Sequence, residues 1–283
     1  MNQIIISTKF IPKMSLKYYE KRLEFFKQMR RIGYKFLHFD FNRFEMNELL
    51  DEKWMMRLFD DISNSDIKIL NSHLYVNPLE NIWDNNGYEK EMKIWRVLEQ
   101  CLKYNKILDI GNTVYHVPEL RYLDISKCQR FISKVPRLLD LSAKYNNCIC
   151  LENHYNAKID NFILSYLFHR FDKDVLRMTF DTGHYLLSRN EKIIESDFFE
   201  RLSLVHLHDN DREKDIHKIP DITNNAYLWN RIFAQIKKNP AKPPLIFEIE
   251  QDVMTHSMNY IGSLQWMYMQ LCNIIDYYNL INN

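Results

Sequence analysis

The sequence of 283 residues has little of several features that mark particular protein classes. It has only five glycines, and no Gly-x-Gly-x-x-Gly motif follows an apolar run, which argues against a dinucleotide-binding open sheet. No stretch approaches the roughly 18 apolar residues of a membrane span. The apolar run near the N-terminus is too short for a signal peptide. We therefore expect no membrane partner.

Neither charge nor cysteine content is unusual. The 38 Lys and Arg residues nearly balance the 37 Asp and Glu residues, so net charge gives no support for a nucleic-acid partner. The five cysteines include no CxxC pair, and their odd number does not suggest a disulfide framework. We expect a cytoplasmic protein in which Cys148 and Cys150 fill core space and do not bind metal.

Apolar runs of strand length alternate with segments of helical periodicity along the whole chain. The predicted strands are 3–7, 36–39, 68–70, 113–115, 148–151, 178–180, 204–205 and 244–247. The predicted helices are 16–32, 48–63, 86–105, 124–145, 161–170, 191–201, 227–238 and 257–280. Such alternation indicates a parallel sheet, and eight pairs in this length indicate an α/β protein with a single (β/α)8 TIM barrel, one domain over residues 1–283. A doubly wound open sheet is the alternative.

Most of these strands end in histidines or carboxylates. The active site of a (β/α)8 barrel lies at the C-terminal ends of its strands, so these side chains would converge on one mouth. Buried carboxylates are costly unless they are paired or bind metal, and imidazole with carboxylate suits Zn, Mn or Fe. The sequence therefore predicts a metal site. The nine candidate ligands are His73, His116, Glu152, Asp181, His184, His206, Asp215, His217 and Glu248.

Short motifs at these strand ends carry a resemblance to a known family. They are LEN (151–153), FDTGH (180–184), VHLHDND (205–211), DIH (215–217) and PLIFE (244–248). In this order they resemble the xylose isomerase-like superfamily of TIM barrels, which includes sugar isomerases, sugar epimerases and endonuclease IV. SHLYVNP (72–78) and YHVP (115–118) resemble the third and fourth strand ends of that family, so the resemblance spans nearly the whole chain.

The resemblance implies a catalytic divalent metal, zinc, manganese or a similar ion. The ligand set that matches the sugar isomerases and epimerases is Glu152, Asp181, His206 and Glu248. In endonuclease IV all nine matching positions bind three metals, so one to three ions are expected. His208 is an alternative to His206, because strand residues two apart point the same way.

Two loops depart from the family pattern. A glycine-rich PGxG turn often follows the DxH motif, but here the chain reads Ile219-Pro220-Asp221; the HPG of the fourth strand is His116-Val117-Pro118. Mouth loops set substrate choice, so these departures affect the expected substrate more than the metal ligands. Tyr75, Trp83 and Tyr155 are candidates for stacking on a sugar or a base.

Two enzyme classes fit this residue set. In the first, an isomerase or epimerase acts on a sugar or sugar phosphate: a metal polarises the carbonyl, while Glu152 and Glu248 move a proton at the adjacent carbon. In the second, a metal cluster hydrolyses a phosphoester, as in an endonuclease IV-like AP endonuclease. Only the second has a nucleic-acid partner. We favour the first, because no basic or aromatic DNA-reading loop is evident; intact carboxylates argue against a third reading, a non-catalytic barrel.

Overall fold

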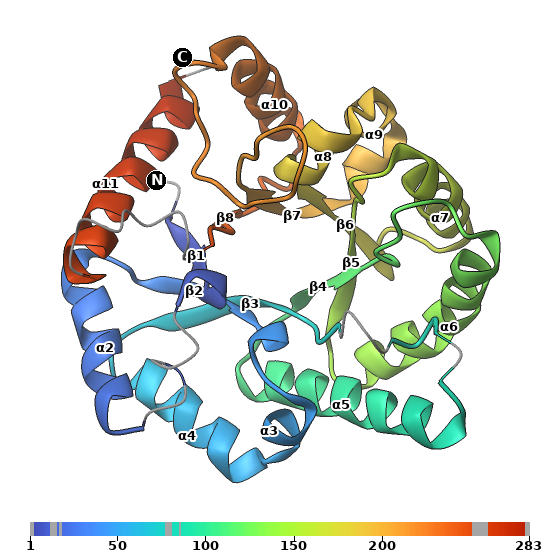
Figure 1. Ribbon diagram of the computed structural model, residues 1–283, viewed down its shortest axis with the longest axis horizontal. Helices are drawn as coiled ribbons and strands as arrows, with labels where there is room; N and C mark the ends of the chain where they lie inside the picture. The colour runs from blue at the N-terminus through green and yellow to red at the C-terminus, as the bar shows by residue number, and fades with distance from the viewer. Residues whose placement is uncertain are drawn as a thin grey trace.

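In a computed structural model, the protein forms a closed barrel of parallel strands that follow one another in chain order (Figure 1). The structure describes residues 3–11, 16, 19–76, 81–84, 86–250 and 260–280. The strands are β1 (Ile5–Ser7), β2 (Phe36–Asp40), β3 (Lys68–His73), β4 (Asn112–His116), β5 (Cys148–Glu152), β6 (Leu176–Asp181), β7 (Leu202–Leu207) and β8 (Leu245–Phe247). Because β1 pairs with β8 and closes the ring, the predicted (β/α)8 barrel is confirmed and the open-sheet alternative is wrong.

Helices form a ring around the barrel (Figure 1). The α-helices are α2 (Tyr19–Ile32), α3 (Met46–Leu50), α4 (Glu52–Ser63), α5 (Tyr88–Ile107), α6 (Ile125–Lys144), α7 (Ala157–Arg170), α8 (Thr182–Ser188), α9 (Glu191–Glu195), α10 (Ala226–Lys238) and α11 (Tyr260–Leu280). The short 3-10 helices are η1 (Thr8–Phe10), η2 (Phe41–Arg43) and η3 (Asp197–Arg201). Across the residues described, no helix combines the length and the apolar character that crossing a membrane requires.

Local capping explains where the helices differ from expectation. Segment 48–63 contains the end of α3 and all of α4, because Asp51 interrupts it and its side chain accepts a hydrogen bond from Trp54 N at 3.0 Å. Segment 191–201 is α9 followed by η3, with Ser196 as the N-cap of η3. Helix α8 is not expected from the sequence; it begins because Asp181 Oδ1 accepts a hydrogen bond from His184 N at 2.7 Å. Residues 17–18 and 257–259 of two predicted helices lie outside the described residues.

The barrel interior changes in chemistry from one layer to the next. Its apolar layer is a buried cluster of Ile5, Val114, Cys150, Leu204 and Ile246. Two residues further along the chain come Ser7, His116, Glu152 and His206, on the same strands, and Glu248, directly after β8. Since strand residues two apart point to the same side, the polar residues follow the apolar layer along the barrel axis. The polar strand ends thus lie next to a packed apolar layer.

Candidate metal centre

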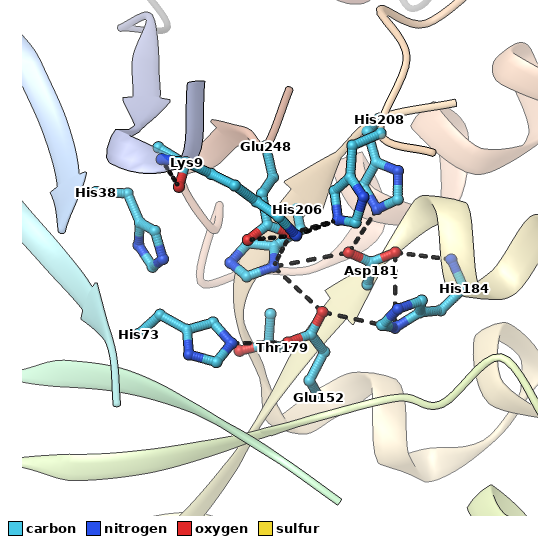
Figure 2. Close-up of polar contacts among 12 residues, drawn as sticks. Lys9, His38, His73, Glu152, Thr179, Asp181, His184, His206, His208 and Glu248 are labelled. Atoms are coloured by element: carbon cyan, nitrogen blue, oxygen red, sulfur yellow. Dashed lines mark hydrogen bonds and ion pairs between the residues drawn. The ribbon is translucent and has the colours of Figure 1, made fainter. Parts of the chain in front are cut away.

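Four buried residues at the C-terminal ends of the strands form a central ligand group, shown in Figure 2. They are Glu152, Asp181, His206 and Glu248, and each offers one ligand atom within 4.8 Å of the others. Strand register brings them together, since Asp181 and His206 are paired positions of β6 and β7. His206 Nδ1 lies 3.3 Å from Glu152 Oε1 and 3.4 Å from Glu248 Oε2. One imidazole nitrogen among three carboxylates is a donor set suited to a divalent transition metal.

A first outer group consists of His73, His116 and Glu152. His116 and Glu152 are paired positions of β4 and β5. His116 Nε2 lies 3.0 Å and His73 Nε2 3.5 Å from Glu152 Oε2. Glu152 therefore belongs to two groups, with Oε1 toward His206 and Oε2 toward the other two histidines. A carboxylate whose two oxygens face different ligand groups could contribute one oxygen to a cation in each group.

A second outer group consists of His208, Asp215 and His217. The two imidazole rings stack, with centroids 4.0 Å apart and planes 12° from parallel. Asp215 Oδ1 lies 3.8 Å from His208 Nδ1 and 3.7 Å from His217 Nδ1. None of these three buried atoms has a hydrogen-bond partner among the residues described. Buried polar atoms normally have a partner, so the convergence of three unpartnered donor atoms fits a bound cation.

All nine predicted ligands lie at this mouth. Of these nine, His184 alone belongs to none of the three groups found among the described residues. His184 lies between two of them, with Nε2 3.2 Å from Asp215 Oδ2 and Nδ1 3.6 Å from Glu152 Oε1. The sequence left His206 and His208 open as alternatives. The structure places His206 in the central group and His208 in the second outer group, where its Nε2 is also 2.9 Å from Asp181 Oδ2.

Ion pairs keep the carboxylates of the site charged. Burial opposes the charge of Glu152, but His116 and His206 hold the pKa of that carboxyl well below its usual range. Burial likewise opposes the charge of Glu248, and Lys9 and His206 lower its pKa. Burial disfavours charged His116 too, yet Glu152 raises the pKa of that imidazole to about 10. A proton on such a histidine competes with a metal cation for the same ring nitrogen.

Lys9 is a site residue that the sequence analysis misses. It lies in η1, immediately after β1, and its Nζ is 2.6 Å from His217 Nε2 and 3.8 Å from Glu248 Oε1. Although burial disfavours the charged amine, Glu248 and Asp215 raise the pKa of Lys9 above its ordinary value. A lysine just after a strand is usually a surface residue, so the sequence carries no signal that singles it out.

His38 is a second residue that the sequence analysis misses. It is fully buried on β2, inside the barrel, and its Nδ1 lies 2.8 Å from Asn71 Oδ1. Burial, followed by the charges of His206 and His73, lowers the pKa of His38 to about 3. The signal that could have found it is a histidine in the middle of an otherwise apolar strand, FLHF.

Of the three aromatic residues predicted to stack on a substrate, one is placed to do so. Tyr75 and Trp83 are buried in the main hydrophobic core, where Trp83 packs edge-on against Phe131. Tyr155 is half-buried, and its ring lies 4.0 Å from that of His154 and 5.9 Å from that of His184. The prediction therefore remains only for Tyr155.

Comparison with known proteins assigns the chain to a family. Residues 26–269 match the sequence pattern of the family described as xylose isomerase-like TIM barrel, and the protein belongs to that family. A stretch of 117 residues is 30% identical to the uncharacterized protein y4fM of Sinorhizobium fredii. That match covers 40% of this chain and 37% of the length of y4fM.

Solved structures share the fold over nearly the whole chain. A D-tagatose 3-epimerase-like protein superposes with a TM-score of 0.68 at 14% identity, covering 97% of this chain and 98% of its own. The 3-keto-D-glucoside 4-epimerase of E. coli gives 0.63 at 13% identity, covering 95% and 99%. A xylose isomerase domain protein from Alicyclobacillus acidocaldarius gives 0.70 at 9% identity, covering 99% and 100%. At these identities the likeness shows the fold.

Proposed function

We propose that the protein is a divalent-metal-dependent isomerase or epimerase that transfers a proton at the carbon beside the carbonyl of a sugar or sugar phosphate. One observation carries this proposal: Glu152 and Glu248 reach one buried ligand group from β5 and β8, two strands that β6 and β7 separate. Two carboxylates that approach one substrate from different strands suit removal and return of a proton. Family membership and the epimerase names of two structural neighbours support it.

The residues divide the work as follows. A cation held by Glu152, Asp181, His206 and Glu248 would act as a Lewis acid on the substrate carbonyl. Glu152 and Glu248 form the acid–base pair, one accepting the proton and the other returning it. Lys9, 3.8 Å from Glu248 Oε1, favours the ionised carboxylate that accepts a proton. With a single cation in the central group, the outer histidines are free to contact hydroxyl or phosphate oxygens of the substrate.

Proton exchange with deuterated water tests the reaction. The metal-loaded protein is incubated with a panel of ketoses, aldoses and their phosphates, and NMR follows loss of the carbon-bound proton beside the carbonyl. We expect exchange with at least one member of the panel and none with the chelator-treated protein. If no sugar exchanges while an abasic-site DNA duplex or a simple phosphodiester is cleaved, the isomerase proposal is wrong.

A second candidate function, phosphoester hydrolysis, is favoured by one specific observation. Three ligand groups lie side by side, Glu152 is shared by two of them, and the third contains three unpartnered donor atoms. Such a cluster suits activation of water and in-line attack on a phosphodiester, whereas proton transfer needs one metal. Anomalous scattering from metal-soaked crystals separates the two: a single peak beside Glu152 supports the isomerase, and two or three peaks raise the hydrolase, with nucleic acid as its partner, above it.

A further inference from the structure

The two ring nitrogens of His206 have different surroundings. Nδ1 faces the carboxylates of the central group, and the dashed lines to Asp181 and Glu152 in Figure 2 start from it. Nε2 is buried and has no hydrogen-bond partner in the described part of the chain. A histidine that binds metal through one nitrogen almost always donates the other N–H to an acceptor. His206 therefore lacks the acceptor that a metal ligand requires.

His38 is the neighbour that can supply this acceptor. It lies on the side of His206 away from Asp181 and Glu152 (Figure 2), with ring centroids 5.1 Å apart and planes at 75°. His38 is fully buried, and its Nε2 is also without a hydrogen-bond partner among the described residues. Two adjacent rings thus each hold one buried, unpartnered nitrogen.

Asn71 decides which of these nitrogens donates. Its amide oxygen lies 2.8 Å from His38 Nδ1, and a carbonyl oxygen can only accept, so His38 Nδ1 carries the proton. A neutral imidazole protonated at Nδ1 has a free lone pair at Nε2, and burial disfavours the charged ring. His38 Nε2 is therefore an acceptor, and His206 Nε2 becomes a donor when its Nδ1 binds a cation. The two unpartnered atoms are complementary.

We propose that His38, oriented by Asn71, is a positioning residue for the metal ligand His206. When His206 Nδ1 binds the cation, His38 Nε2 would accept a hydrogen bond from His206 Nε2–H and so fix the tautomer that presents the Nδ1 lone pair to the cation. This inference rests on the proposed metal site. It adds to that site a chain of Asn71, His38 and His206 that runs from β3 through β2 to β7 inside the barrel.

A matched pair of substitutions at position 38 tests the role. His38→Gln keeps an acceptor oxygen at this position. His38→Met introduces a side chain of similar length that has no strong acceptor. Zn²⁺ affinity is measured by competition with a chromogenic chelator. We expect His38→Met to bind the ion about 10- to 100-fold more weakly than wild type, the usual effect of losing such a partner, and His38→Gln to recover most of that loss. A merely structural role would weaken both variants alike.

NMR of the unmodified protein gives a readout that does not depend on the variants folding. Long-range ¹⁵N–¹H spectra of the zinc-loaded, ¹⁵N-histidine-labelled chain should show His206 protonated at Nε2 and His38 at Nδ1. The opposite tautomer of His38, or equal zinc affinity in wild type and His38→Met, would overturn this inference while leaving the metal proposal intact. If wild type itself binds no divalent metal, both the proposed function and this inference are wrong.

Discussion

The apolar layer and the polar layer that follows it are built on the same strands but differ in what they hold. Val114, Cys150 and Leu204 fill space in the first. Two residues further on, His116, Glu152 and His206 belong to the ligand groups of the second. The backbone is continuous and the side chains point the same way, so the difference lies in the side chains alone. The apolar layer thus contributes packing, and the polar layer carries the candidate chemistry.

Replacing Glu248 by Gln changes the polar layer and leaves the apolar layer intact. We expect this substitution to have the largest effect on turnover. The amide keeps the shape and one oxygen for coordination but cannot accept the proton. Turnover in the exchange assay should fall about 100- to 10,000-fold, while metal content by elemental analysis stays near that of wild type. Ile246→Val, two residues earlier on β8 and in the apolar layer, is the matched control and should keep its turnover. Retained activity in Glu248→Gln would remove this residue from the acid–base pair.

Truncating a side chain of the apolar layer should lower stability and leave the metal site intact. Leu204→Ala removes a fully packed side chain two residues before His206, and such a cavity costs about 2–5 kcal/mol in the free energy of unfolding. Urea denaturation of the metal-free protein measures this loss. Zinc affinity of the folded variant should change little. If Leu204→Ala loses zinc as severely as His206→Ala does, the two layers do not act independently.

The pH dependence of the metal-free protein sharpens the comparison further, with a smaller effect. The pKa of His116 is raised from 6.5 to about 10 in the folded state, chiefly by Glu152 against the cost of burial. A raised folded pKa means that the stabilisation is complete below the unfolded value of 6.5 and is lost as pH rises toward 10. We expect the contribution of His116 to this loss to be smaller than the cost of Leu204→Ala, since the His116 side chain is 19% exposed.

A substitution of the titrating group supplies the control for the pH experiment. His116→Gln has no imidazole to titrate, so denaturation curves of this variant should depend less on pH between 6.5 and 10. Metal binding should show the opposite trend from stability, strengthening as pH rises, because the cation displaces protons from the histidines. An equally steep loss of stability in wild type and His116→Gln would assign the effect to another group.

The sequence predicts the barrel well because its signals are local. Most strands contain an apolar run that stops at a polar residue, as CICL stops at Glu152, and this pattern follows from burial. The predicted helix boundaries are wrong where one residue both ends an element and caps the next helix. Asp181 ends β6 and also caps α8, and Asp51 both ends α3 and caps α4. Periodicity does not record such a cap, so it merges or overlooks short helices.

The sequence predicts the composition of the site but not its partition. It gathers nine residues at one mouth, yet strand periodicity predicts the same direction for His206 and His208. Only their neighbours in three dimensions separate them. Lys9 and His38 are missed for a related reason. Lys9 reaches the site because η1 directs it toward His217, and His38 matters through a contact with His206. Neither contact is encoded in spacing along the chain.

Metal stoichiometry of protein purified without chelators tests the central claim most directly, namely that Glu152, Asp181, His206 and Glu248 hold a catalytic cation. Elemental analysis should find at least one equivalent of a divalent transition metal per chain in wild type, and the His206→Ala variant should lose it. Because site formation and metal binding are linked, the wild-type ion should also raise the unfolding temperature. Less than roughly half an equivalent, even after reconstitution with zinc or manganese, would contradict the account.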